Sequence, residues 1–115
     1  MSRRFCLGLD LKDDPELIKQ YIHYHEPGNV WPEIIQSLYD SGIENMEIYL
    51  NGNRLFMILE VNDHFSLDRK AEMDLANEKV QEWETLMQSK FQQALPWKKE
   101  LKWVRMDKVF DLSKH

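Results

Sequence analysis

The segment MEIYLNGNRLFMILEV, residues 46–61, contains the clearest structural signal in the chain. Apolar residues at every second position from 46 to 50 alternate with Glu47 and Tyr49, which is typical of a strand with one buried face. The Asn-Gly-Asn sequence at 51–53 is a strong turn signal, and an apolar return strand follows from Leu55 to Val61. The segment therefore predicts an antiparallel hairpin.

Strand and helix signals precede this hairpin. Residues 4–11 alternate around four apolar positions and predict a strand. Acidic residues and a proline at 13–16 predict the start of a helix that continues to His25. A second helix is predicted to begin at residues 31–33, Trp-Pro-Glu, and to end at the Ser-Gly pair 41–42.

Two helices and a strand are predicted after the hairpin. A polar helical segment runs from Asp63 to about Ala76, and a longer helix runs from about Asn77 to Ala94, before Pro96. The last strand is expected over about residues 101–112.

This order of elements predicts an α+β ferredoxin-like sandwich, with an antiparallel sheet and helices on one face. The 115 residues, 1–115, are expected to form a single domain. The opposite face of such a sheet needs a cover, so we expect two subunits to pair face to face as a homodimer.

Composition limits the classes of partner. A net charge of −5 argues against nucleic-acid binding, which needs clustered basic residues. The first apolar segment breaks at Asp10, too early for a secretory signal, and nothing approaches the ~20 apolar residues of a membrane span. The single cysteine, Cys6, cannot form an internal disulfide and is interpreted as a buried core thiol. These features predict a cytoplasmic protein without a membrane partner.

Metal and cofactor signatures are missing from the sequence. It contains no HExxH or CxxC pattern and no glycine-rich nucleotide loop. His23 and His25 are two positions apart, so they lie on different sides of a helix and cannot chelate one ion. We therefore expect no metal and no cofactor.

Tyr21 and His25 are the first candidate site residues. Their spacing of four places a phenol and an imidazole on one helix face, where they could hold a polar substrate. From spacing alone, a core tyrosine and a helix-end histidine are the commoner interpretation.

Aromatic and acidic residues add further candidates. Trp31 and Trp83 could stack on the C–H faces of a sugar, although core packing explains them about equally well. Glu47 and Tyr49 share one side of their strand and could accept hydrogen bonds from sugar hydroxyls, although an exposed strand face is the commoner outcome.

The sequence resembles the L-rhamnose mutarotase family at YIHYH, residues 21–25, followed closely by VWPE, residues 30–33. That family carries a tyrosine, a histidine four residues later, and a Trp-Pro-Glu helix start. The similarity continues through residues 41–43, 48–50 and 55–60 and reaches Trp83, so it covers nearly the whole chain.

The resemblance implies an isomerase that interconverts the α and β anomers of a monosaccharide, a 6-deoxyhexose, by acid/base-assisted ring opening. It implies a dimeric α+β barrel in which His25 is the catalytic proton donor and Tyr21 contacts the sugar or relays the second proton. The expected substrate-binding residues are Tyr21, Trp31, Met46, Glu47, Tyr49, Trp83 and Glu84.

Three departures from the family pattern concern sugar recognition. The second of two paired tryptophans is Glu84 here, a pocket tyrosine is Met46, and the segment between His25 and Trp31 is two residues longer. L-Fucose is therefore a candidate substrate beside L-rhamnose.

A different class of function stays open at this point. A non-catalytic small-molecule binding module, or a monooxygenase-like protein of the dimeric α+β barrel type, would have the same fold. Carboxylates near Trp83 favour a sugar over a heme or quinone.

Overall fold

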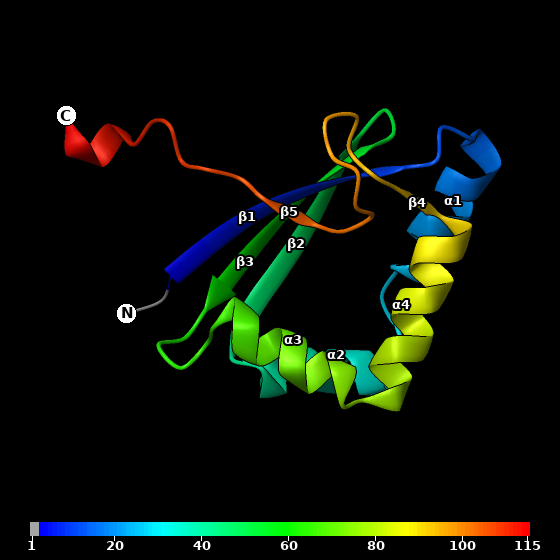
Figure 1. The fold of residues 1–115 in the computed structure, drawn as a ribbon, viewed down its shortest axis with the longest axis horizontal. Coiled ribbons are helices and arrows are strands. Elements are labelled where there is room, and N and C mark those ends of the chain that lie inside the picture. The colour runs from blue at the N-terminus through cyan, green and yellow to red at the C-terminus, as the bar shows by residue number, and fades with distance from the viewer. Residues whose placement is uncertain (1–2) are drawn as a thin grey trace.

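The computed structural model describes residues 3–115. The four α-helices lie on one side of an antiparallel sheet, and the C-terminal segment extends away from it (Figure 1). The elements in chain order are β1 (Arg3–Leu11), α1 (Pro15–Tyr24), α2 (Pro32–Asp40), β2 (Ile43–Asn51), β3 (Arg54–Val61), α3 (Leu67–Leu75), α4 (Glu78–Lys90), β4 (Gln92–Gln93), β5 (Val104–Arg105) and the 3-10 helix η1 (Leu112–Lys114).

The sheet has the order β2-β3-β1-β4, and β5 also pairs with β1. Every pairing is antiparallel, and β1 lies along β3 from Arg3 opposite Val61 to Asp10 opposite Arg54. The two strands of the predicted hairpin are neighbours, while β1 inserts between β3 and β4. This arrangement confirms the predicted α+β ferredoxin-like sandwich.

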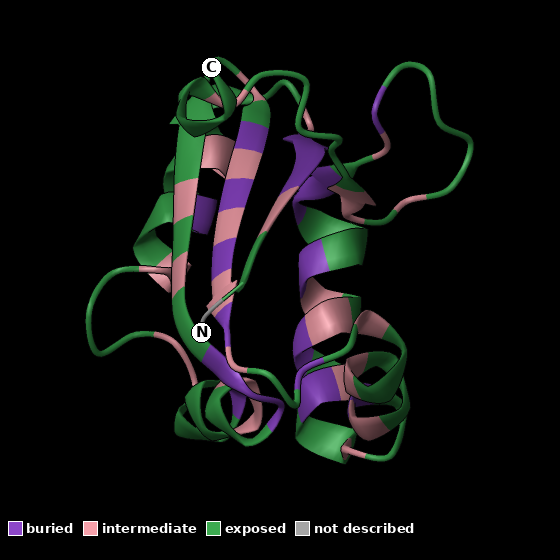
Figure 2. Cartoon of the chain, turned by 90° about the vertical axis from the view of Figure 1, so that its left-hand side faces the viewer, coloured by how far each residue is buried: buried purple, intermediate pink, exposed green. Residues whose placement is uncertain are grey.

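The core lies between the sheet and the helices. Along β3 the residues alternate between buried and half-buried, and this banding is visible in Figure 2. The buried side chains on the helix side of the strands pack against apolar residues of all four helices. The largest fully buried side chains of the protein include Leu9, Leu11, Leu55, Phe91 and Leu95.

Local hydrogen bonds explain where the helices begin. The Asp14 carboxylate accepts hydrogen bonds from the backbone N–H groups of Glu16 and Leu17, at 2.9 and 3.3 Å. Ser66 caps α3 and Asn77 caps α4 in the same way. These side chains satisfy N–H groups that the first helical turn leaves unpaired.

Gly42 makes the turn from α2 into β2 possible. Its φ of +101° lies in the region that only glycine enters without strain, and an added Cβ would stand 2.7 Å from the Asn62 side-chain oxygen. Gly52, with a φ of +62°, forms the predicted hairpin turn.

The predicted extent of the last long helix is wrong. The helix α4 ends at Lys90 instead of near Ala94, because Gln92 and Gln93 pair with the end of β1. Phe91, which follows the helix directly, is fully buried.

The predicted last strand is also wrong in its length. Only Val104 and Arg105 pair with β1 in place of a strand over 101–112. The Asp111 carboxylate accepts hydrogen bonds from Lys108 and from the Ser113 backbone, both at 3.0 Å. Such local hydrogen bonds compete with a strand ladder and favour the short helix η1.

Two smaller observations complete the fold. Cys6 is half-buried instead of fully buried, because it lies opposite Ile58 in the register, away from the buried residues of β3. Among residues 3–115, no helix has both the length and the apolar character required to cross a bilayer.

Candidate active site

A cavity of about 880 Å³ lies between the sheet and the helices. Its volume is within the range of small-molecule sites, roughly 300–1,000 Å³. The strands contribute an apolar wall that includes Leu7, Met46, Ile48, Leu55, Met57 and Leu59. The polar and charged lining comes mainly from the helices and includes Tyr21, His25, Lys70, Asp74, Glu84 and Gln88.

Tyr21 and His25 meet at the C-terminal end of α1. Their rings stack with centroids 4.1 Å apart, as their spacing of four predicts. The His25 Nδ1 atom lies 2.7 Å from the Tyr21 carbonyl oxygen. A carbonyl oxygen only accepts hydrogen bonds, so Nδ1 carries the proton and neutral His25 keeps a lone pair on Nε2.

Burial determines the protonation state of both rings. Desolvation lowers the pKa of His25, and this effect outweighs the bond to the Tyr21 carbonyl, which raises it. Burial raises the pKa of the Tyr21 phenol well above its usual value. At neutral pH, His25 is therefore a neutral base and Tyr21 keeps its proton.

Trp83 supports the histidine from the side of α4. Its ring lies edge-on to His25 with centroids 5.6 Å apart, and Tyr24 and Trp31 contact it at 6.2 and 5.1 Å. Trp83 lines the cavity, whereas Trp31 packs against the Trp83 ring and is not part of the lining. Trp31 therefore supports Trp83 from outside the cavity lining.

The charged side of the cavity comes from α3 and α4. The Lys70 ammonium lies 2.5 Å from the Asp74 carboxylate, and both side chains are mostly buried. Gln81 donates hydrogen bonds to the Asp74 carbonyl at 2.9 Å and to the Glu84 carboxylate at 3.5 Å. Burial raises the pKa of Glu84, the negative charge of Asp74 adds to this, and Lys70 opposes it.

Lys70 and Asp74 were not among the residues expected from the sequence. Their spacing of four on one helix was the available signal, but it is also the spacing of ordinary surface ion pairs. Trp103, which was also not among the expected site residues, lines the cavity as well.

Of the seven expected substrate-binding residues, four line the cavity, and a fifth, Trp31, packs against Trp83. The other two lie outside the cavity. Met46 lines the cavity. Glu47 and Tyr49 lie opposite Ile58 and Phe56 in the register, on the alternate positions that point away from the helices. They are exposed on the outer face of the sheet, outside the cavity of their own chain.

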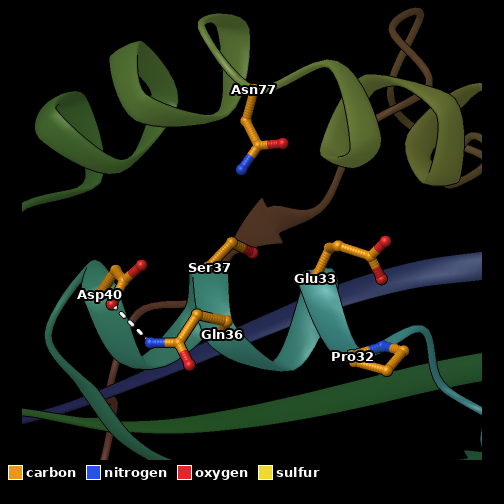
Figure 3. A pocket seen from close by; sticks show the side chains of 6 residues that line it. All are labelled: Pro32, Glu33, Gln36, Ser37, Asp40 and Asn77. Atoms are coloured by element: carbon orange, nitrogen blue, oxygen red, sulfur yellow. Dashed lines mark hydrogen bonds between the residues drawn. The ribbon is translucent and has the colours of Figure 1, made fainter.

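A second, shallower cleft of about 470 Å³ lies between α2 and Asn77. Figure 3 shows its polar lining, in which Gln36 donates a hydrogen bond to Asp40 at 2.8 Å. Its lining contains neither an aromatic ring nor a histidine. The candidate catalytic residues that the sequence predicts, Tyr21 and His25, line the larger cavity.

The larger cavity suits a polar, uncharged ligand with exchangeable protons. It combines a neutral imidazole, a protonated phenol, an aromatic wall and a charged edge. No three His, Cys, Asp or Glu side chains within residues 3–115 are grouped as a metal site would require.

Comparisons with known proteins agree on one family. A family model described as L-rhamnose mutarotase matches residues 4–112. A protein named L-fucose mutarotase, from Xanthomonas campestris pv. campestris, is 41% identical over 112 residues, which cover 96% of this chain and 89% of that protein. A UPF0734 protein from Dictyostelium discoideum is 38% identical over 118 residues, which cover 96% and 90% of the two chains.

A solved structure shows the same fold. The crystal structure of an L-rhamnose mutarotase from Formosa agariphila superimposes with a TM-score of 0.68 at 23% identity. The match covers 96% of this chain and 98% of that one.

Proposed function

The chain belongs to the L-rhamnose mutarotase family, and we propose that its cavity interconverts the α and β anomers of free L-fucose. The protein is accordingly an isomerase of sugar anomers. The observation that carries the proposal is the pairing of a neutral His25, with a free Nε2 lone pair, and the Tyr21 phenol in one cavity.

The reaction needs two proton movements. A cyclic sugar opens to its aldehyde when the C1 hydroxyl loses a proton and the ring oxygen gains one. Since His25 is neutral at pH 7, it acts first as a base and takes the C1 hydroxyl proton through Nε2. This differs from the expectation drawn from the resemblance, in which His25 is the proton donor.

Tyr21 is placed to serve the ring oxygen. Its phenol donates a proton to that oxygen as the bond between C1 and the ring oxygen breaks. Rotation about the C1–C2 bond then presents the other face of the aldehyde. When the C5 hydroxyl attacks that face and closes the ring, Tyr21 recovers a proton from this hydroxyl and His25 returns its proton to the C1 oxygen. Both side chains end in their starting states, so the cycle needs no net proton.

The catalytic demand on these residues is modest. A well-placed acid or base is typically worth about 10²–10⁴ in rate. Anomers already exchange spontaneously in water, so an enhancement of this size is useful.

One observation favours L-fucose over L-rhamnose, and a second concerns the wall that would distinguish the two sugars. The relative that is 41% identical along nearly the whole chain is named an L-fucose mutarotase. Glu84, which stands where the family pattern has a tryptophan, lines the cavity, and its carboxylate accepts hydrogen bonds that an indole ring cannot accept. L-Fucose and L-rhamnose differ only in the arrangement of their hydroxyls, so a changed polar wall acts on that difference.

The working unit is proposed to be a homodimer. The sheet face that carries Glu47 and Tyr49 has no helical cover, and Tyr49 is 55% exposed. The C-terminal segment leaves Val109 and Phe110 95% and 65% exposed, as expected for side chains that a second copy covers. Sedimentation equilibrium tests this: a dimer that dissociates in Val109→Ser/Phe110→Ser supports the proposal, and a wild-type monomer at micromolar concentration contradicts it.

The cytoplasm is the proposed location. The single thiol, Cys6, forms no disulfide within the chain and is compatible with a reducing compartment. Cell fractionation of the source organism tests the assignment, which recovery of the protein in a secreted fraction would contradict.

Saturation-difference proton NMR tests the proposed function. One anomeric signal is saturated and the other is observed, with catalytic amounts of protein and L-fucose, L-rhamnose or D-glucose in turn. Transfer that is strongest with L-fucose supports the proposal. Transfer that is strongest with L-rhamnose corrects the substrate, and no transfer with any sugar rejects the activity.

A further inference from the structure

The Lys70–Asp74 ion pair lies in the wall of the cavity instead of on the outer surface of α3. Its two side chains are 22% and 12% exposed, and the ammonium and carboxylate are 2.5 Å apart. Taking two charges out of water costs free energy that their attraction often only offsets. The pair is therefore poorly explained by stability alone, and its place in the lining of the cavity that also contains the candidate catalytic residues suggests a role in binding.

Glu84 belongs to the same charged group. Gln81 holds it from α4, with one amide nitrogen shared between the Asp74 carbonyl and the Glu84 carboxylate. Both Asp74 and Lys70 influence the proton affinity of Glu84, so the three charges act in one electrostatic field. All three side chains line the cavity.

The donors and acceptors of this group match the hydroxyls of a sugar. An ammonium has three N–H donors, of which the bond to Asp74 uses one, and two carboxylates supply acceptors. Each sugar hydroxyl both donates and accepts, so neighbouring hydroxyls can bind a lysine and a carboxylate together. Hydrogen bonds to charged groups are the stronger kind and carry more discrimination.

The remaining walls are compatible with an orientation of the sugar that directs its hydroxyls to the charged group. His25 and Trp83 lie side by side, and Glu84 follows Trp83 on α4. The strands offer an apolar wall, in which Met46 and Ile48 suit the C6 methyl group of a 6-deoxyhexose. With C1 at His25 and the methyl on the sheet, the hydroxyls of C2 to C4 face the charged group.

We propose that Lys70, Asp74 and Glu84 form a hydroxyl-recognition wall that selects which monosaccharide binds, an inference that rests on the proposed function. The wall acts on the ring hydroxyls away from C1. His25 and Tyr21 therefore keep their chemistry when the wall is altered.

The test uses two isosteric variants and two controls. Lys70→Gln/Asp74→Asn removes both charges and avoids a lone buried one, and Glu84→Gln removes the third. Lys19→Gln on α1 and Glu72→Gln on α3 are matched controls, because both residues are exposed and outside the cavity lining. Thermal unfolding checks that each variant is folded.

The readouts separate binding from chemistry. For each protein, kcat and KM for anomer exchange are measured with L-fucose, and the dissociation constant is measured by NMR titration with L-fucose and its 2-, 3- and 4-deoxy analogues. In the wall variants we expect KM and the dissociation constant for L-fucose to rise roughly 10-fold to 100-fold, with kcat within about 3-fold. In wild-type protein, a deoxy analogue that lacks a hydroxyl bound by the wall should have a higher dissociation constant than L-fucose. For at least one analogue this difference should disappear in the wall variants, and the controls should match wild type.

Each result has one meaning. Wall variants that are folded and bind L-fucose as tightly as wild type overturn the wall and leave the proposed function intact. Wild-type protein that binds L-fucose without exchanging its anomers overturns the proposed function. In that case the dissociation constants of L-fucose and the deoxy analogues still test whether the wall selects the sugar. If the double variant does not fold, Glu84→Gln alone decides, since it leaves the Lys70–Asp74 pair in place.

Discussion

Replacing Trp83 with alanine should damage both the stability and the activity of the protein. Trp83 is 8% exposed, and its ring contacts three other aromatic rings, those of Tyr24, His25 and Trp31. It joins the packing of α1 to that of α4 and also forms the wall beside the candidate base.

The size of the stability loss follows from this packing. Truncating a buried tryptophan to alanine typically costs about 3–5 kcal/mol. Trp83 borders an open cavity that water can fill, so we expect a loss near the lower end, about 3 kcal/mol. Trp83→Phe keeps an edge-on ring against His25 and should lose about 1–2 kcal/mol.

Urea unfolding followed by far-UV circular dichroism at pH 7 measures the loss, and anomer exchange of L-fucose measures the effect on catalysis. In the folded Trp83→Ala variant, the His25 ring loses its lateral support, and the exchange rate should fall at least about 10-fold. A stability loss below 1 kcal/mol, or an unchanged exchange rate, would refute the role given to Trp83.

Three further predictions concern protonation and the backbone. Because burial lowers the pKa of His25, catalysed exchange should persist at pH 6.5 and disappear only at lower pH; a midpoint above pH 6.5 in the rate profile would contradict this. Below pH 6.5 the unfolded chain binds more protons at His25 than the folded chain does, so the free energy of unfolding should also decline as pH falls from about 6.5 towards the lowered pKa of His25. Burial raises the pKa of Glu84, so the folded chain binds more protons at Glu84 than the unfolded chain, and the protein loses stability as pH rises. Glu84→Gln should therefore have a higher Tm than wild type at pH 7. A lower Tm would contradict this prediction. Gly42→Ala should lose roughly 1–3 kcal/mol by urea unfolding, because its Cβ meets Asn62, and should lose more than Gly52→Ala, which has open space; equal losses would reject the clash.

The sequence predicts the elements of this fold that depend on local signals. The hairpin at residues 46–61 and the helix start at Asp14 depend on turn chemistry and capping, which act over a few residues. The ends of α4 and of the last strand depend on pairing with β1, far away in the chain, and on competing side-chain bonds at Asp111. Neither can be seen in local periodicity.

For the candidate site, too, the sequence predicted the features that depend on local spacing and missed those that depend on the three-dimensional structure. The spacing of Tyr21 and His25 was sufficient to place them together, because a helix fixes which residues are neighbours. Met46 and Glu47 could not both line one cavity, since adjacent residues of a strand point to opposite faces. The neutral state inferred for His25 depends on burial and on its bond to the Tyr21 carbonyl, which only the three-dimensional structure supplies.

The central claim is that His25 catalyses the exchange of L-fucose anomers, and a matched pair of histidine variants tests it most directly. His25→Asn removes the Nε2 base, while His23→Asn changes an exposed ring two residues away. The measurement is the anomer exchange rate at pH 7 by saturation-difference NMR, with circular dichroism as the check on folding. We predict that His23→Asn matches wild type and that His25→Asn loses about 10²–10⁴ of the catalysed rate. A folded His25→Asn variant that exchanges L-fucose at the wild-type rate would contradict the account.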